Sequence, residues 1–556
     1  MKPKMRQELY LIARNAAIAV FLFLVTVAVI MGVTYLHSRT HPPVPSPRLE
    51  ELIEILNTAG AEEELKEAVM SYDLMARRAH FQNLAFMRRG AHLFFFGGLL
   101  LIMLIKLASL LKEKEPVPGK FTEQKEDPGE ITLAQQVILG AGIFIVATAF
   151  ILSVLHPGSL PPLRDPGVTP ASPEEMMLNW PSFRGYGGRG YASGDYPVEW
   201  DRETGQNIIW ETSLPLPGVN SPVVWEGKVF LAGADESRRE VYCIDAETGN
   251  KLWSAQTSGG ANVRIPQVDA DTGLAAPTVA TDGLHLGAVF ATGELLLLDL
   301  EGNIIREIQL GLPDNVYGHA SSLIAENGVL FVQYDHDGGS AVMGYEMDTG
   351  RLKWRRDREV MTSWSSPVMR GPGDERELIL LAEPLLAGYD PETGDPLWEL
   401  ENLVTGEIGT SCAFYGDRIY AANAYSALVC VDAASGEVLW RYYDDLPEAS
   451  SPVARGGFLI LPSSYERVSC LDAETGERLW HHDTGEWYYS SPVIAGDKVY
   501  LSDKSGVTHI FKLSDEYIPV SAPDLGERIV STPAFSGGRI YIRGAENLYC
   551  IGYDGE

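Results

Sequence analysis

The stretches IDAETGNKLW, at Ile244–Trp253, and LDAETGERLW, at Leu471–Trp480, nearly repeat each other although they lie far apart in the chain. In both, Asp is followed by Thr and Gly, and Trp comes four residues after Gly. The Asp carboxylate can accept N–H bonds within its own turn, and Gly supplies the positive φ that closes the turn. Because Trp carries a large apolar surface, we expect it to pack against a neighbouring unit.

This turn recurs too often to be a ligand site. A ligand on a single axis would not need so many copies, whereas repeated packing would. We therefore interpret the pattern as structural docking. The clear copies contain Gly249, Gly350, Gly394, Gly436 and Gly476 and end at Trp253, Trp354, Trp398, Trp440 and Trp480. Weaker copies are DLEGNIIREI, from Asp299, and LSDEYIPV, from Leu513.

A second element, a small residue followed in most copies by Pro, recurs at intervals of 40 to 55 residues. Its copies are SPVV (from Ser221), APTV (Ala276), SSLI (Ser321), SPVM (Ser366), SCAF (Ser411), SPVA (Ser451), SPVI (Ser491) and TPAF (Thr532). Hairpin patterns such as EGKVFLAG and GDKVYLSD follow these copies, and alternating apolar segments such as VYCID come next. The sequence therefore predicts eight units of four short strands.

These residues resemble a known family, the PQQ-like β-propeller repeats, which occur in quinoprotein dehydrogenases and in the propeller lipoprotein of the outer-membrane assembly machinery. NWPSFRG, at Asn179–Gly185, also looks like the entry to such propellers. The resemblance covers residues 179–556 and implies an all-β, eight-bladed β-propeller with four-stranded blades. Because the eighth unit ends soon after Tyr549, we expect IIWETSL, from Ile208, to supply its fourth strand and close the ring.

The acidic charge is concentrated in the part predicted to form the propeller. The chain has 44 Lys and Arg against 75 Asp and Glu. Residues 1–178 hold 17 and 18 of these, which leaves 27 and 57, a net charge of −30, in residues 179–556. Such a surface repels phosphate backbones, so we exclude nucleic acid as a partner. It also disfavours a position flat on an anionic leaflet.

Three apolar runs, 16–36, 91–111 and 137–155, are long enough to cross a bilayer, which takes about 20 helical residues. The first run lacks a small-x-small cleavage site, so we interpret it as a retained anchor. The predicted order is a tail (1–15), a span (16–36), a helical loop (37–90), a span (91–111), a loop (112–130), a segment with the third span (131–155) and a Pro-rich linker (156–178).

Basic residues favour one orientation of these spans. Lys2, Lys4, Arg6 and Arg14, with the lysines of the 112–130 loop, favour a cytoplasmic tail and second loop. Arg77, Arg78, Arg88 and Arg89 in the 37–90 loop oppose that orientation. We predict a multi-pass protein of the inner, cytoplasmic membrane whose propeller faces the periplasm or the exterior.

The cysteines do not follow the pattern of the dehydrogenases. Enzymes of the resembled family typically hold PQQ between a Trp and a disulfide of adjacent cysteines, beside Ca²⁺. Here no two cysteines are adjacent, and we interpret them as buried core residues that form neither a disulfide framework nor a zinc site. They are Cys243, Cys412, Cys430, Cys470 and Cys550.

Metal and phosphate sites are weakly indicated. DADTG, from Asp269, and YDHDGG, from Tyr334, place two carboxylates at alternate positions before Gly, a spacing usable in a Ca²⁺ loop. Neither reaches a bidentate Glu, and polar β-turns are the alternative. RGYGGRG, from Arg184, does not join a strand to a helix as a phosphate loop does. We predict no metal site, no catalytic residue and no cofactor.

Ligand binding is expected, if anywhere, at the mouth of the funnel, where segments enter each first strand. The candidate residues there are His319, Trp364, Trp487, Tyr488 and Arg528. An aromatic platform with a cation suits a planar anionic cofactor, and equally a peptide strand or a purely structural role. The sequence leaves these alternatives open.

Two functions remain after these exclusions. The first is a membrane-anchored, non-catalytic propeller that binds protein partners outside the cytoplasm, in envelope assembly. The alternative is a membrane-bound, PQQ-dependent dehydrogenase that oxidises alcohols or sugars and passes electrons to quinone, with calcium as a second cofactor. The missing Cys pair favours the first.

Overall fold

The computed structural model describes residues 10–24, 26, 103–104, 106–107, 111, 169–260, 263–371 and 376–553. The chain divides into two compact units, Met1–Val168 and Thr169–Glu556. In the first unit, residues 10–24 are helical. Among the described residues, no helix combines the length and the apolar character needed to cross a membrane. Apart from the short pieces given above, the three predicted spans and the loops between them lie outside the described residues.

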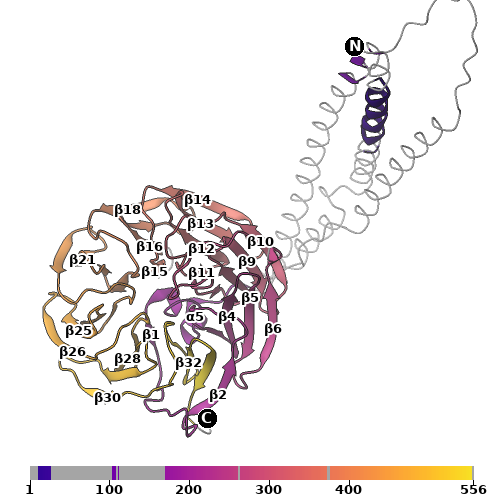
Figure 1. Cartoon of the computed structure of the whole chain (residues 1–556). Coiled ribbons are helices and arrows are strands. Elements are labelled where there is room, and N and C mark those ends of the chain that lie inside the picture. The colour runs from indigo at the N-terminus through magenta and orange to yellow at the C-terminus, as the bar shows by residue number, and fades with distance from the viewer. Residues whose placement is uncertain are drawn as a thin grey trace, which may run out of the picture. The chain divides into compact units, whose positions relative to one another are not determined.

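The second unit is an eight-bladed β-propeller of four-stranded blades, as predicted (Figure 1). Blades 1 to 4 are β3–β6 (Val223–Trp225, Lys228–Ala234, Arg239–Asp245, Lys251–Gln256), β7–β10 (Ala280–Thr281, His285–Val289, Glu294–Asp299, Ile304–Gln309), β11–β14 (Ile324–Glu326, Val329–Tyr334, Ser340–Glu346, Leu352–Arg358) and β15–β18 (Val368–Arg370, Glu377–Ala382, Leu385–Tyr389, Pro396–Glu401). Blades 5 to 7 are β19–β22 (Ala413–Tyr415, Arg418–Ala422, Leu428–Asp432, Val438–Tyr442), β23–β26 (Val453–Arg455, Phe458–Pro462, Arg467–Asp472, Arg478–Asp483) and β27–β30 (Val493–Ala495, Lys498–Ser502, Thr508–Lys512, Pro519–Ser521).

Blade 8 joins the two ends of the propeller. Its inner strands are β31 (Ala534–Ser536), β32 (Arg539–Arg543) and β33 (Asn547–Ile551), and its outer strand is β2 (Ile208–Ser213). β2 pairs antiparallel with β33 over Ile208–Ser213 and Asn547–Ile551. The prediction that IIWETSL closes the ring is therefore confirmed.

Each blade runs outward from the axis, with its first strand innermost (Figure 1). Because successive strands are antiparallel, the turns after strands one and three lie on one face of the ring, here called the turn face. The turns after strand two and the connections between blades lie on the other, here called the entry face. The middle strands are almost wholly buried, whereas outer strands such as β26 alternate between exposed and half-buried residues. Blade-to-blade packing thus forms the core.

The opening pattern forms the turn that its residues predict. Asp245 Oδ1 accepts the backbone N–H of Glu247 and of Thr248, at 3.1 and 2.8 Å, and Gly249 has a φ of +71°. Asp472 makes the same bonds in blade 6. The side chain and backbone of Thr248 hold the pKa of Asp245 below its usual value, and the backbone of Thr475 does so for Asp472. The charged carboxylate therefore stabilises each turn.

Several of the Trp residues dock on the glycine turn of the next blade. A Cβ added at Gly476 would lie 2.6 Å from the Trp440 ring, and one added at Gly249 would lie 2.7 Å from the Trp210 ring of β2. The indole N–H groups of Trp253, Trp354 and Trp480 donate to carbonyls of Leu300, Pro391 and Ser514 in the following blade. Trp398 differs, because it donates to Glu377 of its own blade. Trp210, like Trp440, docks on the glycine turn of the next blade, although it was not among the predicted docking residues.

The small-residue element forms a closed ring of hydrogen bonds around the axis. In each blade a hydroxyl accepts the backbone N–H of the equivalent residue in the preceding blade, at 2.9 to 3.1 Å, and Thr532 N–H returns to Ser221 Oγ. The members are Ser221, Thr278, Ser322, Ser366, Ser411, Ser451, Ser491 and Thr532. Blades 2 and 3 therefore use Thr278 and Ser322, not Ala276 and Ser321, which headed the repeats in the sequence. Equivalent positions in the eight blades are therefore identified by the hydroxyl group, not by the Pro of the sequence pattern.

The propeller unit begins before Asn179. Helix α5 (Pro173–Leu178) starts at a capping box in which Ser172 and Glu175 bond to each other's backbone N–H groups. Met176 is buried, and Ala171 N–H donates to Asp282 O at 2.9 Å. The last ten residues of the segment assigned to the Pro-rich linker thus belong to the compact unit that starts at Thr169.

Candidate functional site

The turn-face end of the axis is filled by the chain's own N-terminal segment, residues 180–192, here called the axial plug. Trp180 pairs with Val224 of blade 1, and β1 (Tyr191–Ala192) pairs in parallel with β27 of blade 7. Between them, Tyr186 accepts a hydrogen bond from Arg376 of blade 4 at 2.7 Å. Figure 1 shows this segment, in purple, in the middle of the ring. The Gly-rich stretch from Arg184 makes this tight crossing, since its glycines at 185, 187, 188 and 190 have positive φ.

Arg184 points from the plug into the axis. Its guanidinium donates to the carbonyl oxygens of Cys412, at 3.2 Å, and Pro452, at 2.5 Å, each directly after a member of the hydroxyl ring. The side chain is fully buried, and this burial lowers the pKa of Arg184 to about 10. The residue remains charged at neutral pH and joins blades 5 and 6 through their backbones. Sequence reasoning missed this role because the two acceptors are backbone atoms.

On the entry face, His319 and Trp364 occupy neighbouring positions. His319 is completely buried beside Tyr334, with ring centroids 4.8 Å apart, and burial lowers its pKa to about 3. It is therefore neutral at physiological pH. Trp364 donates its indole N–H to Gly318 O at 2.9 Å and packs on Tyr317. Both side chains are engaged in packing.

The other three candidates lie in blades 6 to 8. Trp487 is exposed and donates to Glu466 at 3.1 Å, whereas Tyr488 is buried and burial raises its pKa. Arg528 forms an ion pair with Asp271, and Lys504 reaches the same carboxylate at 2.7 Å. The ammonium group of Lys504 also lies 4.3 Å from the centroid of the Tyr489 ring.

A strap, residues 268–273, lies between these two groups. Asp269 N–H donates to Tyr317 O at 3.0 Å, and Asp271 pairs with Lys504 and Arg528. The strap thus joins the connection between blades 2 and 3 to blade 7 and the connection after it. The five candidate residues at the mouth do not form one shared platform. His319 and Trp364 lie together, whereas Arg528 is paired with Asp271 of the strap. The DADTG stretch, whose spacing is usable in a Ca²⁺ loop, lies in this strap. Its Asp271 pairs with Lys504 and Arg528.

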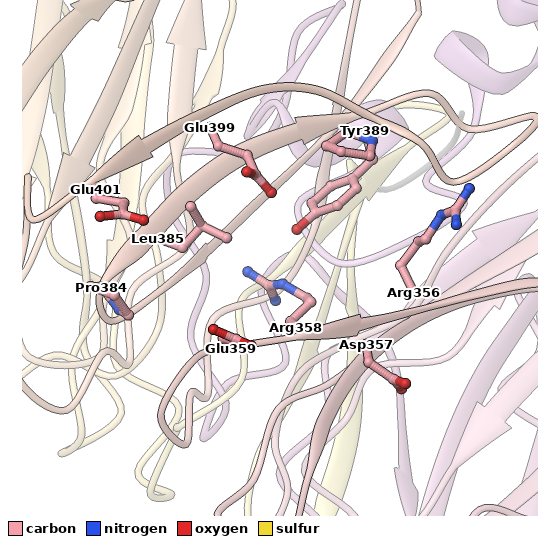
Figure 2. A pocket seen from close by; sticks show the side chains of 10 residues that line it. Arg356, Asp357, Arg358, Glu359, Pro384, Leu385, Tyr389, Glu399 and Glu401 are labelled. Atoms are coloured by element: carbon pink, nitrogen blue, oxygen red, sulfur yellow. The ribbon is translucent and has the colours of Figure 1, made fainter.

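A cavity of about 310 Å³ lies at the side of the ring, between the outer strand of blade 3 and blade 4 (Figure 2). Glu359, Glu399 and Glu401 make its rim acidic. Its buried cation, Arg358, already pairs with Asp335 and lies over the Tyr389 ring, 5.9 Å from the centroid. Burial raises the pKa of Asp335 despite this pair. Both cations of the lining, Arg356 and Arg358, are thus paired with carboxylates, although Nε and Nη2 of Arg358 have no hydrogen-bond partner.

The residues at the mouth do not fit PQQ as the resembled dehydrogenases bind it. The five cysteines are free and buried, and burial raises the pKa of each thiol to about 12. His319 and Tyr488 are buried, and Arg528 is paired with Asp271, which also pairs with Lys504. For calcium, Asp335 and Asp271 are both held by cations. Within the described ranges, no three His, Cys, Asp or Glu residues are grouped to hold a metal ion.

A family model described as outer membrane protein assembly factor BamB matches residues 187–316 and 382–555, which together exceed half of the chain. A relative in Burkholderia pseudomallei (strain K96243), also named outer membrane protein assembly factor BamB, is 27% identical over 252 residues. That match covers 42% of this chain and 58% of the relative, so the chain spans less than two thirds of the relative's length.

Solved structures show the same fold. The quinohemoprotein alcohol dehydrogenase from Comamonas testosteroni has a TM-score of 0.54 at 14% identity, covering 68% of this chain and 82% of that one. A europium-containing methanol dehydrogenase has a TM-score of 0.52 at 10% identity, covering 68% and 99%. At such identities the likeness concerns the propeller alone.

Proposed function

The chain belongs to the family of the outer membrane protein assembly factor BamB, and on that premise we propose that it is a non-catalytic propeller that binds protein partners in envelope assembly. We further propose that three spans, at 16–36, 91–111 and 137–155, anchor it in the inner membrane, with the propeller in the periplasm or outside the cell. The basic residues of the 1–15 tail and of the 112–130 loop support this orientation, whereas Arg88 and Arg89, beside the second span, oppose it.

The observation that carries the proposal is the occupation of both ends of the axis by the chain itself. The axial plug fills the turn-face end, with Arg184 directed inward. On the entry face the strap places Asp271 against Lys504 and Arg528, the cations that a planar anion would need. Apart from the acidic cavity between blades 3 and 4, recognition is left to the exposed surface of the loops, which suits another protein rather than a buried cofactor.

The proposal is tested by isolating the full-length chain with its partners. The protein is extracted from the membranes of the producing cells with a mild detergent and captured through a C-terminal tag, and co-purifying proteins are identified by mass spectrometry. We expect a stable envelope protein in near-stoichiometric amount. Extraction by alkaline carbonate should fail to release the chain if the three spans are present.

The same preparation tests the dehydrogenase alternative. PQQ and Ca²⁺ are added, and the cofactor absorbance and the reduction of a dye by alcohols or sugars are measured. Stoichiometric, reducible PQQ would overturn the non-catalytic proposal. Its absence, together with a co-purifying protein, would exclude the alternative.

A further inference from the structure

Four large aromatic side chains stand exposed on the entry face of blades 5 to 7. Tyr425 is 78% exposed, Tyr443 64%, Tyr465 62% and Trp487 47%. Exposed aromatic side chains that gather in one area are typical of binding surfaces, because Tyr and Trp are enriched at protein–protein interfaces. None of the four is used by the axial plug or by the strap.

These side chains lie on neighbouring loops of the entry face, and the four residues are here called the aromatic face. Tyr443 directly follows Tyr442, which pairs with Leu428, so it lies at the same end of blade 5 as the turn that contains Tyr425. The connection after Tyr443 contacts the next turn, because Ser464 N–H donates to Leu446 O at 3.2 Å. Tyr465 follows Ser464, and its neighbour Glu466 accepts the Trp487 indole N–H at 3.1 Å.

Carboxylates stand exposed among these rings, and the cations beside them are paired, among them Lys504, next to Trp487, which pairs with Asp271. Asp444, Glu448, Glu466 and Glu486 are all exposed there. The nearest guanidinium groups are already engaged: Arg467 pairs with Asp445 and Asp483, Arg478 pairs with Asp445, and Arg441 donates to Leu403 O. The surface therefore offers π faces and carboxylates together, within a domain that is strongly acidic as a whole.

Such a surface is complementary to a polypeptide segment that carries Arg side chains spaced by apolar residues. A guanidinium can lie on a Tyr or Trp ring and pair with the carboxylate beside it, and the apolar residues cover the rest of the rings. The net charge of the propeller would attract such a segment from a distance.

We propose that the aromatic face is the docking site for an Arg-rich, partly apolar segment of a partner protein. This inference rests on the proposed function, since it names the chemistry of the partner that the propeller would bind. It also assigns a role to Trp487 that is independent of the four other mouth residues.

The test uses the full-length protein in nanodiscs of phosphatidylcholine and a fluorescent short peptide of alternating Arg and Leu. Fluorescence anisotropy should show binding that weakens as salt is raised, whereas a peptide of alternating Glu and Leu should not bind. Tyr443→Ala, Tyr465→Ala and Trp487→Ala should each weaken binding about tenfold, as interface aromatics do. Tyr465→Phe should retain most of the affinity, because it keeps the ring.

The matched control is Tyr415→Ala, since Tyr415 is 43% exposed and belongs to blade 5, as Tyr443 does, but lies on the turn face. It should leave the affinity unchanged. Glu486→Gln should weaken binding and reduce its salt dependence. Melting temperatures of all variants establish that each is folded.

Several results would overturn the inference: equal binding of the Arg and Glu peptides, no binding of the Arg peptide, or equal effects of Tyr415→Ala and Tyr465→Ala. Binding of free phosphatidylcholine vesicles that is lost in Trp487→Ala would assign the face to a lipid surface instead. If the peptide fails while a partner still co-purifies with the chain, the proposed function stands and only this site is rejected. If a partner co-purifies, a photoreactive residue in place of Trp487 should cross-link to an Arg-rich segment of it.

Discussion

At the scale of single residues, the glycine of the Asp-x-x-Thr-Gly turn has two separate duties. It adopts a positive φ, and in Gly249, Gly394 and Gly476 it leaves room for a Trp of the preceding blade. Gly476 does both, with a φ of +75° and the Trp440 ring 2.6 Å from where a Cβ would lie. Gly416 has a φ of +58° but nothing within 4 Å of that position. Substitutions at Gly416 and Gly476 therefore distinguish the cost of backbone strain from the cost of displacing the Trp ring.

We expect Gly416→Ala to cost about 1 kcal/mol in the free energy of unfolding, from the left-handed conformation alone. Gly476→Ala should cost about 1 to 3 kcal/mol more, because the methyl group would displace Trp440. Thermal unfolding of both variants, followed by circular dichroism, measures the difference. Equal losses would mean that Trp440 does not depend on the glycine.

His319 predicts a dependence of stability on pH. Burial lowers its pKa from the usual 6.5 to about 3, so below pH 6.5 the unfolded chain binds a proton that the folded chain does not. The contribution of His319 is therefore full above pH 6.5 and is lost as the pH falls toward 3. His319→Phe should show a smaller fall in melting temperature between neutral pH and pH values near 4 than the unchanged chain. An identical fall in the two proteins would refute the assignment.

At the scale of elements, the far side of the strap is held by ion pairs, while Val268 and the backbone of Asp269 hold its near side. The Asp271 side chain is about one quarter exposed, at 23%, and pairs with both Lys504 and Arg528. Partly exposed pairs of this kind contribute roughly 0 to 1 kcal/mol each and are weakened by salt. The strap should therefore open more easily than the strands beneath it.

Asp271→Asn should raise amide hydrogen exchange in the strap by up to about tenfold, because two ion pairs are lost together. Exchange in β8 and β9 should stay unchanged, since these strands are buried in blade 2. High salt should have the same effect on the unchanged protein. Asp235→Asn, which removes an exposed pair with Arg238 in blade 1, is the control and should leave the strap unaffected. Unaltered exchange in Asp271→Asn would show that other contacts hold the strap.

At the scale of the whole molecule, the propeller depends on a junction between distant segments. β33 lies between β32 and β2, and its residues Leu548, Tyr549, Cys550 and Ile551 are fully buried. Burial of each large apolar side chain contributes roughly 1.5 to 3 kcal/mol. The hydroxyl ring closes at the same junction, between Thr532 and Ser221.

Truncation after residue 546 should therefore abolish cooperative unfolding, or lower the melting temperature severely, because β2 loses its partner and the ring opens. Truncation after residue 553 is the control, since it keeps all of β33. Differential scanning calorimetry and size-exclusion chromatography of the two proteins measure the effect. A compact, cooperatively melting 546-residue chain would contradict closure by β2.

The sequence by itself determined the number of blades, their strand pattern and the closing strand. It could do so because each depends on local and repeated chemistry: Asp and Gly in turns, alternation in strands, and Trp at a fixed distance from Gly. The sequence placed the equivalent residues less accurately in the blades whose repeat departs from the Ser-Pro pattern. In blades 2 and 3 the hydrogen-bonding hydroxyls of Thr278 and Ser322 lie one or two residues from the positions that the Pro pattern suggested.

Only the tertiary structure decided what lies at the two ends of the axis. Arg184 binds carbonyl oxygens more than two hundred residues away, and Asp271 reaches Lys504 and Arg528 across the mouth. Neither contact leaves a pattern in the sequence, because backbone carbonyls carry no residue identity and an ion pair between distant loops has no fixed spacing. The Asp-x-x-Thr-Gly turns could be read locally since each completes its bonds within a few residues, whereas the occupancy of the axis depends on how all eight blades converge.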